Sequence, residues 1–323
     1  MSTSQPGVVA ILGLRSFVGR ELALRLSSGP PGLRILGLDL RRPLGLDERV
    51  RFHRIDLTEP RADTTLAAIL EKQRVEALVH AAFRTDPTPD HERDHELDAI
   101  GSLRVMNACA AAKVRRLVVA STTMGYGPHP DNPNYLTEEH PLRGHPGAHA
   151  VRDRIEMERL LGDWRVQHPD VEVSVLRACW AIGPAFWNRI VRYLSLPVVP
   201  LPIGYDPLIQ LVHEQDLLDA FERALLTSHA GVFNVVGSGV LPVSTLFRIA
   251  GQRTLPLPSL LLDRLSSPWQ SQSGDPPAAF FDYLRYLWVA DGRRGWDAFG
   301  EPAYSTKEAW ISFVSSRRMR RYR

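Results

Sequence analysis

Three small residues near the start of the chain are spaced for contact with a phosphate group. Gly13, Ser16 and Gly19 follow the apolar run Val8–Leu12 at intervals of three residues and open a helical pattern. Backbone amides at a helix start, aided by the helix dipole, favour a negatively charged ligand. Gly13 permits a tight turn, and Gly19 lets the helix pack closely against the strand. Ser16 takes the place of the glycine that usually stands in the middle of such a turn.

An acidic residue follows this turn at the distance that a dinucleotide requires. The second apolar run, Arg34–Leu38, ends in Asp39, which lies twenty residues after Gly19. A carboxylate there accepts hydrogen bonds from the ribose hydroxyls of adenosine. The turn and Asp39 together predict a dinucleotide-binding βαβ unit, whereas the turn alone also fits an ordinary buried strand followed by a helix. The turn residues expected to contact the dinucleotide are Gly13, Arg15, Ser16, Phe17, Val18 and Gly19.

The charges after the second run predict NAD as the cofactor, with NADP as the less favoured alternative. Asp39 accepts ribose hydrogen bonds and would repel a 2′-phosphate. Arg41 and Arg42 follow closely, and an arginine just past the acid can pair with a 2′-phosphate. An acid at the strand end usually outweighs a basic residue two positions later, so the sequence favours NAD.

Composition places the chain among ordinary globular proteins. Its 323 residues allow one large α/β domain with a smaller lobe, or two domains. The hydrophobic fraction of 44% and the charged fraction of 23% are typical of soluble proteins, and a net charge of +3 does not call for a nucleic-acid partner. Three of the 39 basic residues are lysines (Lys72, Lys113 and Lys307), which leaves few candidates for a catalytic lysine.

The two cysteines, Cys109 and Cys179, lie in apolar surroundings, which favours buried free thiols over a disulfide or a metal site. The chain shows no cationic leader followed by an apolar core and a cleavage site, and no run of 18 apolar residues. The sequence therefore predicts a cytoplasmic protein without a transmembrane segment and without a bound metal.

Apolar runs alternate with helical patterns through the first half of the chain, which predicts a doubly wound sheet of parallel strands. The expected strands are Val8–Leu12, Arg34–Leu38, Arg51–Ile55, Ala77–His80, Arg116–Ala120 and Glu172–Arg177. The expected helices are Gly19–Ser27, Thr64–Lys72, Glu92–Ala112 and Arg152–Gln167. Ligands of such sheets lie beyond the carboxyl ends of the strands, so the residues after each strand are the candidates for chemistry.

The second half of the chain is interrupted by prolines and predicts a smaller lobe over the strand ends. The expected strands are Gln210–His213 and Gly231–Val236, the expected helices are Glu214–Leu226, Val243–Gln252, Ala278–Val289 and Ser305–Ser315, and Leu255–Pro277 is expected to be irregular. We expect residues 1–180 to form a Rossmann-like NAD(P)-binding domain. Residues 181–316 are expected to form a substrate-binding lobe, some elements of which return to the Rossmann core. The arginine-rich residues 317–323 predict a disordered tail, with contact to an anionic surface as the alternative.

Motifs over nearly the whole chain, from about residue 7 to residue 313, resemble those of extended short-chain dehydrogenases/reductases of the NAD-dependent epimerase/dehydratase family. The turn at 13–19 resembles the family's glycine-rich loop, residues 121–127 its Ser-Ser-x-x-x-Tyr-Gly segment, and residues 177–184 its arginine-to-Gly-Pro turn. The resemblance implies a sugar-nucleotide substrate and a homodimer formed through the helices Glu92–Ala112 and Arg152–Gln167. The cofactor contacts that it implies beyond the turn are Asp56, Leu57, His80, Ala81 and Ala82.

The resemblance breaks at the family's catalytic pair. Family members carry a tyrosine and, four residues later, a lysine on one helix face. The lysine lowers the tyrosine pKa, and the tyrosine moves a proton while hydride goes to the cofactor. Matching Glu158 to the family's helix glutamate places Ala150 at the tyrosine and Arg154 at the lysine. A shifted alignment does not restore the pair, because the sequence has no tyrosine between Tyr135 and Tyr193.

Other residues near the altered pair are candidates for binding the ribose, binding the substrate and transferring the proton. Arg154 is cationic and can hold ribose hydroxyls, but an arginine does not transfer protons at neutral pH. Thr122 matches the family's substrate-binding hydroxyl, and Ser121 lies beside it. His149 or Tyr126 could serve as the general base, with a surface histidine and a packing tyrosine as the alternatives.

Two functions from different classes fit these residues. The first is an NAD-dependent oxidoreductase that acts on a sugar nucleotide or related polyol with a non-standard acid/base. In this hypothesis Arg177, Arg189 and Arg192 are candidates for binding a diphosphate. The second is a catalytically silent NAD-binding sensor or scaffold, which the loss of tyrosine and lysine supports. A third hypothesis is contact with a partner or a membrane surface through Leu260–Leu265 and the arginine tail, although core packing explains these leucines equally well.

Overall fold

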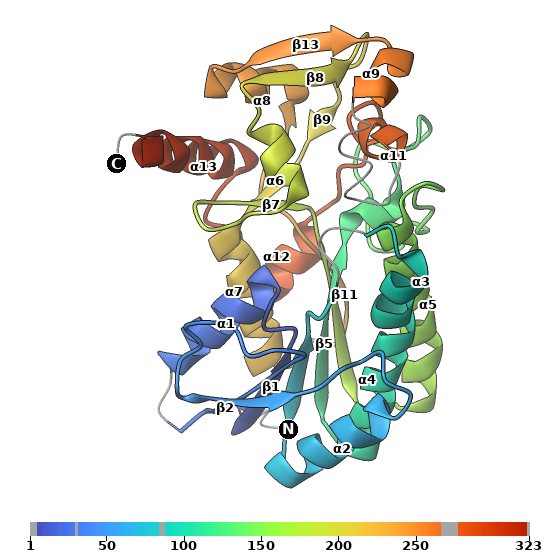
Figure 1. The fold of residues 1–323 in the computed structure, drawn as a ribbon, viewed down its shortest axis with the longest axis vertical. Helices are drawn as coiled ribbons and strands as arrows, with labels where there is room; N and C mark the ends of the chain where they lie inside the picture. The colour runs from blue at the N-terminus through green and yellow to red at the C-terminus, as the bar shows by residue number, and fades with distance from the viewer. Residues whose placement is uncertain (1–4, 30–31, 84–87, 266–276, 322–323) are drawn as a thin grey trace.

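A parallel seven-stranded sheet forms the centre of the molecule (Figure 1). The computed structural model describes residues 5–29, 32–83, 88–265 and 277–321. The sheet strands are β1 (Val8–Leu12), β2 (Arg34–Asp39), β3 (Val50–Arg54), β4 (Ala77–His80), β5 (Arg116–Thr122), β6 (Glu172–Ala178) and β11 (Gly231–Val235). They lie in the order β11-β6-β5-β4-β1-β2-β3, with every neighbouring pair parallel. The predicted doubly wound, Rossmann-like α/β fold is confirmed.

Helices cover both faces of this sheet, because its strands are apolar on both sides. All five residues of β1 are buried, and they alternate between two cores, with Ile11 in one and Leu12 in the other. The first core packs against α1 (Phe17–Ser27) and α7 (Glu214–Leu226). The second packs against α2 (Ala62–Gln73), α4 (Gly101–Ala111) and α5 (His149–Gln167).

Two predicted helices have different bounds in the structure. The helix expected at Glu92–Ala112 consists of α3 (His91–His95), a π-helical turn (Glu96–Ile100) and α4. The helix expected to start at Arg152 starts at His149. These three additional residues matter for the site, because they fix which side chains at the start of α5 face the sheet edge.

The small lobe lies above the carboxyl ends of the sheet strands in Figure 1. It contains three two-stranded pairings: β7 (Trp180–Ile182) with β10 (Leu211–His213), β8 (Val198–Pro202) with β13 (Arg253–Leu257), and β9 (Leu208–Ile209) with β12 (Leu241–Pro242). Its helices are α6 (Arg189–Leu194), α8 (Val243–Ala250), α9 (Ser259–Leu265), α11 (Pro277–Asp282) and α13 (Thr306–Arg321). Some later elements belong to the main body: β11 completes the sheet, and α12 (Arg293–Phe299) packs on β11 and α7.

The expectation that Leu255–Pro277 is irregular was wrong in its described part. Residues up to 257 belong to β13, and α9 follows from Ser259, while residues 266–276 lie outside the described ranges. The helix expected at Ala278–Val289 was also too long, since α11 ends at Asp282. A turn there buries Tyr283 and Trp288, whose rings meet edge-on at 5.3 Å.

The prediction of a disordered tail is corrected for residues 317–321, because α13 extends to Arg321. Arg318 Nη2 donates a hydrogen bond to the carbonyl of Ala250 at 3.0 Å, and the Arg317 guanidinium lies over the rings of Phe313 and Trp187. Residues 322–323 lie outside the described ranges. Across the ranges that the structure describes, no helix combines the length and the apolar character needed to cross a membrane.

Candidate functional site

The turn between β1 and α1 requires glycine at two positions. Gly13 has a φ of +98°, and a Cβ atom there would overlap the backbone of Ala81 and Ala82, which follow β4. A Cβ atom on Gly19 would overlap the carbonyl of Gly13. The turn therefore lies tightly against the end of the neighbouring strand, as the sequence predicted.

Ser16 caps α1 instead of supplying a third glycine. Its hydroxyl donates to the Gly13 carbonyl at 2.7 Å and accepts from the Gly19 amide at 3.0 Å. The first intrahelical bond joins the Arg20 amide to the Ser16 carbonyl. The amides of Phe17 and Val18 lie before that bond, at the positive end of the helix, where an anion is favoured.

A cavity of about 290 Å³ extends from this turn across β2 and β3. The Asp39 carboxylate lies in its wall and is held by two backbone amides, from Arg15 at 2.9 Å and from Leu40 at 2.7 Å. Asp56 accepts bonds from the amide and the hydroxyl of Thr58, and these bonds lower its pKa although burial opposes them. The lining residues are Leu12, Gly13, Arg15, Ser16, Asp39, Leu40, Ile55, Asp56, Leu57, Thr58, Ala81, Ala82, Phe83, Arg93 and Leu97.

His80 and Arg41, both predicted cofactor contacts, lie outside this lining. His80 is buried, and its Nε2 atom lies 2.8 Å from the hydroxyl of Ser102. Burial, with a smaller effect of the Arg154 charge, lowers the pKa of His80 to about 3, so its ring is neutral. Arg41 is exposed to solvent. Direct contact of His80 and Arg41 with a cofactor therefore stays a prediction, and neither residue lines the cavity.

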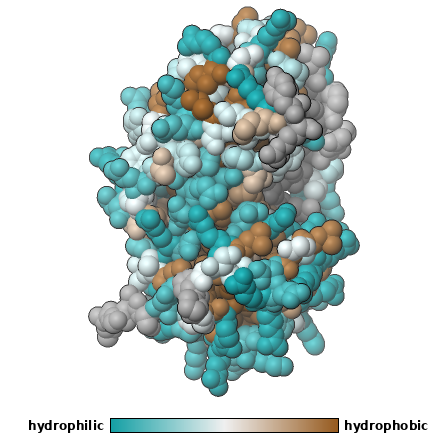
Figure 2. Space-filling view, turned by 90° about the vertical axis from the view of Figure 1, so that its left-hand side faces the viewer, coloured by the Kyte–Doolittle hydropathy of each residue, from teal (hydrophilic) through white to brown (hydrophobic). Residues whose placement is uncertain are grey.

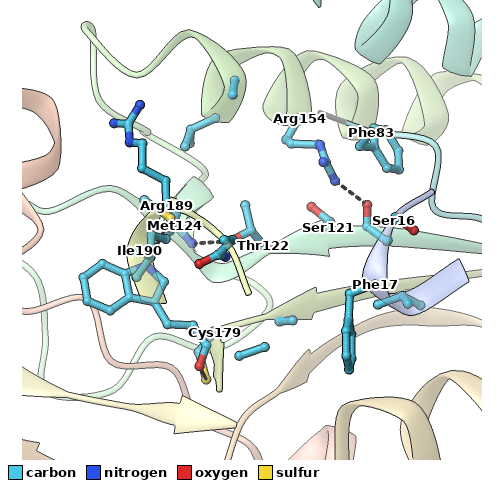
Figure 3. A pocket seen from close by; sticks show the side chains of 18 of the residues that line it. Ser16, Phe17, Phe83, Ser121, Thr122, Met124, Arg154, Cys179, Arg189 and Ile190 are labelled. Carbon is cyan, nitrogen blue, oxygen red and sulfur yellow. Dashed lines mark hydrogen bonds between the residues drawn. The ribbon is translucent and has the colours of Figure 1, made fainter. Parts of the chain in front are cut away.

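A second cavity, of about 470 Å³, lies beyond the ends of β5 and β6 and under the small lobe (Figure 3). It shares Arg15, Ser16, Ala81 and Phe83 with the first cavity, so the two meet around the α1 cap. Figure 3 places Arg154 and Ser16 on one side of Thr122, and Arg189 and Ile190 on the other. Its walls also include Phe17, Val18, Ala120, Ser121, Met124, Ala148, Ala150, Val151, Cys179, Trp180, Phe186, Trp187, Asn188, Phe280 and Tyr283.

Arg154 is fixed in the wall of this second cavity. Its guanidinium carbon lies 3.5 Å from the centroid of the Phe83 ring, and its Nη1 atom donates to the Ala120 carbonyl at 2.9 Å. The buried carboxylate of Asp98 lies 3.9 Å from Nε. Burial lowers the pKa of Arg154 to about 10, which leaves the side chain charged at neutral pH. It can therefore present a fixed positive charge but cannot serve as a proton carrier.

Thr122 and Ser121 end β5 and differ in whether their hydroxyl protons are already donated within the protein. Thr122 Oγ1 accepts a bond from the Met124 amide at 3.2 Å, which leaves its own proton available to a ligand. Ser121 Oγ donates to Glu158 at 2.5 Å, and Glu158 forms a buried ion pair with Arg177 at 2.7 Å. Thr122 is thus the better placed of the two for binding a substrate oxygen.

Tyr126, one candidate for the general base, does not lie at the cavity. It is fully buried; its hydroxyl donates to Asn234 at 2.8 Å and accepts from Arg177 at 3.0 Å. Burial raises the pKa of Tyr126 despite the nearby Arg177. The structure therefore gives this tyrosine the packing position that was the alternative in the sequence analysis.

His149, the other candidate, begins α5 next to the cavity but faces away from it. Its neighbours Ala148 and Ala150 line the cavity, whereas its own ring stacks on that of His91 with centroids 4.0 Å apart. Successive helical residues point about 100° apart, so His149 and Ala150 face different directions. Ala150 presents a methyl group to the cavity wall at the position that the sequence match predicts for the family's tyrosine.

The three arginines predicted to bind a diphosphate have different environments in the structure. Arg177 is occupied by Glu158, Arg192 is exposed, and Arg189 lines the cavity. Sequence reasoning missed Phe83, Trp187 and Phe280 as wall residues, and the last two come from the small lobe. Trp187 could have been predicted as a wall residue, because it follows the Gly-Pro turn at residues 183–184. The sequence around Phe280 contains no comparable motif.

The two cavities together can hold an elongated ligand with an anionic middle. Asp39 would lie at one end, the α1 cap in the middle, and Thr122 with Arg154 at the other. No cluster of three or more metal-binding side chains occurs within the residues that the structure describes. Burial raises the pKa of the Cys179 thiol to about 12, so this wall residue is a neutral, weakly nucleophilic group.

Comparison with known proteins agrees with this geometry. The model of the NAD dependent epimerase/dehydratase family matches residues 9–235. An uncharacterized protein of Mycobacterium tuberculosis (strain H37Rv) is 32% identical over 321 residues, which cover 97% of this chain and 84% of that protein.

Two solved structures share the fold at low identity. UDP-glucose 4-epimerase of Thermotoga maritima, solved with UDP-glucose, has a TM-score of 0.73 at 17% identity, with 97% of this chain and 99% of that chain covered. MoeE5, solved with UDP-glucuronic acid and NAD, has a TM-score of 0.71 at 21% identity and the same coverage.

Proposed function

The chain belongs to the NAD-dependent epimerase/dehydratase family, and from that premise we propose that it binds NAD and transfers hydride to or from a nucleotide sugar or related polyol. One observation carries the proposal: the two cavities meet around Ser16, with Asp39 at one end and Thr122 at the other. This is the shape that a dinucleotide with a substrate beside its nicotinamide would need.

The residues present fit NAD. The Asp39 carboxylate would accept the adenosine ribose hydroxyls with its remaining lone pairs, and the amides of Phe17 and Val18 would bind the pyrophosphate. Arg154 would lie near the nicotinamide ribose, as the family lysine does. NAD, when bound, would supply the hydride acceptor. The exposed position of Arg41, outside the cavity lining, supports NAD over NADP.

Within this proposal Thr122 orients the substrate, because Thr122 lines the cavity and its bond with the Met124 amide uses the hydroxyl only as an acceptor. Arg189 is the candidate for an anionic group of the substrate, such as a diphosphate. Proton transfer is assigned to His149, because its chain neighbours Ala148 and Ala150 both line the cavity and an imidazole is the side chain most often used for general acid–base catalysis. Its ring would have to leave His91 to reach a substrate.

A second function, a catalytically silent NAD-binding sensor or scaffold, is favoured by a specific observation. The sequence match assigns Ala150 and Arg154 to the places of the family pair. The Tyr126 hydroxyl is bound to Asn234 and Arg177, and the His149 ring is stacked on His91. If no group carries the proton, the family's reaction should slow by several powers of ten. NAD binding would persist, because the turn and Asp39 do not depend on that pair.

Native mass spectrometry of the purified protein, with and without NAD and UDP-glucose, tests both functions. Retention of one NAD and one UDP-glucose per chain, followed by absorbance of reduced NAD at 340 nm, is expected for the enzyme. NAD retention with neither reduction of the NAD nor conversion of any sugar nucleotide in a panel would establish the silent function, because an epimerase or dehydratase returns the hydride and need not accumulate reduced NAD. Absence of NAD binding at millimolar concentration would contradict both.

A further inference from the structure

The small lobe exposes a strip of apolar side chains that line neither of the two cavities. Val198 and Leu255 are each 45% exposed, Ile203 is 56% exposed and Leu260 is 66% exposed. In Figure 2, apolar atoms gather at the upper end of the molecule, which is the small lobe of Figure 1. We call this surface the lobe strip; its members are Val198, Ile203, Arg253, Leu255, Leu260, Leu261, Arg318 and Met319.

Backbone pairing brings the members of the lobe strip together. β8 and β13 pair in register, with Val198 opposite Arg253 and Pro200 opposite Leu255. Partners in a parallel pair face the same side, so Val198, Arg253 and Leu255 share the outward face. The amide of Ile203 donates to the Leu257 carbonyl at 3.0 Å, which continues the strip toward α9. An apolar surface of this kind on a globular protein marks an interaction site.

The strip is closed to the addition of another strand. The Arg253 amide and the Leu257 carbonyl both face β8, so the backbone groups of Thr254 and Pro256 face the open edge of β13. Pro256 has no N–H group to offer there. A proline on an exposed edge disfavours pairing with a second chain, so the strip suits a partner that contacts side chains without hydrogen-bonding the backbone.

Positive charges border the apolar residues at the α13 end. Arg253 lies on the outward face itself, and Arg318 is exposed and bound to the Ala250 carbonyl, three residues before Arg253. Met319 beside it is 64% exposed. The Asp206 carboxylate, near the Ile203 loop, is bound by the amide and hydroxyl of Ser244.

We propose that the lobe strip docks on an anionic membrane surface, with Val198, Leu255 and Leu260 in the interfacial layer and the arginines on lipid phosphates. Apolar side chains next to arginines are the combination that an anionic bilayer binds, and a basic cluster alone would be released by salt. Docking at the lobe would leave the cavity mouth close to the membrane, since Arg317 of α13 covers Trp187 in the cavity wall.

Sedimentation of the full-length protein with lipid vesicles tests the proposal. We expect binding to phosphatidylcholine vesicles that contain about one third phosphatidylserine, and little binding to phosphatidylcholine alone. Arg253→Gln and Arg318→Gln should each weaken binding about fivefold. Leu255→Gln should weaken it at high salt, where the arginines contribute less.

Matched controls lie on α5 in the main body, outside the lobe strip (Figure 1). Val166 is 78% exposed and Arg152 is also exposed, so Val166→Gln and Arg152→Gln repeat the same changes away from the strip. Circular dichroism would confirm that each variant is folded. Three outcomes overturn the proposal: no preference for anionic vesicles, equal losses in the α5 controls, or a concentration-dependent dimer that Leu255→Gln disrupts without any vesicle binding.

Discussion

The guanidinium carbon of Arg154 lies 3.5 Å from the centroid of the Phe83 ring, in the wall where the two cavities meet. An aromatic face attracts the cation, and burial strengthens that attraction. The pair therefore sets a fixed positive charge beside the cap of α1, at the position that the sequence match predicts for the family's lysine. A guanidinium held flat on a ring keeps its direction better than a flexible ammonium.

Replacement of Arg154 by methionine should weaken NAD binding about tenfold, because one charge-assisted contact is lost. It should also destabilise the fold by a few kcal/mol, since the buried Asp98 carboxylate loses its neighbouring cation. Isothermal titration with NAD and thermal unfolding measure the two effects. Arg152→Met, on the exposed side of α5, is the control and should change neither. An unchanged NAD affinity in Arg154→Met would remove Arg154 from the cofactor site.

Gly13→Ala should abolish NAD binding and lower the free energy of unfolding by several kcal/mol. The new Cβ atom would meet the backbone of Ala81 and Ala82, which cannot yield without moving the end of β4. Gly45→Ala is the control for backbone strain alone. Gly45 also has a positive φ, of +71°, but no heavy atom lies within 4 Å of the place where its Cβ atom would be. That control should cost about 1 kcal/mol. If Gly13→Ala and Gly45→Ala lower the free energy of unfolding in urea by the same amount, the overlap with Ala81 and Ala82 does not contribute to the loss.

His80 should make the fold sensitive to mild acid. Burial lowers its pKa to about 3, whereas the unfolded chain titrates near 6.5, so the unfolded state binds more protons between these values. Stability is then complete above pH 6.5 and declines as the pH falls from 6.5 toward 3. Between pH 6.5 and pH 5 the loss is about 2 kcal/mol.

Urea unfolding of His80→Asn at pH 7.5 and pH 5 measures this contribution. The variant should be less stable at pH 7.5 but should lose about 2 kcal/mol less on acidification than the original chain. Ser102→Ala is the control, since it removes the hydrogen bond partner and keeps the titrating ring. Identical pH dependence of His80→Asn and the original chain would show that other groups cause the acid sensitivity.

The parts of the site that were predictable are those that depend on neighbours in the sequence. Gly13 and Gly19 are required by a turn of a few residues, and Asp39 ends a strand that pairs directly with β1. Ser16 was identified as a departure from the usual glycine, and the structure supplies its reason, a bond to the Gly19 amide. Local chemistry and strand order are enough to place these residues.

The parts that failed depend on side-chain direction and on distant contacts. The sequence located His149 beside the altered catalytic position. Because successive side chains of a helix point in different directions, the His149 ring lies against His91 and not in the cavity. Phe280 reaches the wall through packing against Trp180 and Tyr193, which are about a hundred residues away in the chain. The predicted homodimer through α4 and α5 stays a prediction, and the exposed side of α5 presents Glu156, Arg159 and Asp163 to solvent.

His149→Gln tests the proposed proton carrier. If a sugar nucleotide is oxidised by this protein, the variant should lower kcat about a hundredfold, because general acid–base catalysis contributes that much or more. His91→Gln, which removes the stacking partner, should lower kcat less than threefold. A normal rate in His149→Gln would assign the proton to another group and favour the silent function.

The double variant Ala150→Tyr/Arg154→Lys tests whether the altered pair is what limits the chemistry. Both positions line the cavity, and they lie four residues apart on α5, so the new side chains would share one helix face. The variant should reduce bound NAD with a nucleotide sugar at least about a hundred times faster than the original chain, since a tyrosine beside a lysine can move the substrate proton. Ala150→Phe with Arg154→Lys is the matched control, because it fills the same space without a hydroxyl. If both variants stay equally inactive while still binding NAD, the cavity does not position a sugar hydroxyl, and the protein's role is to be sought in NAD binding alone.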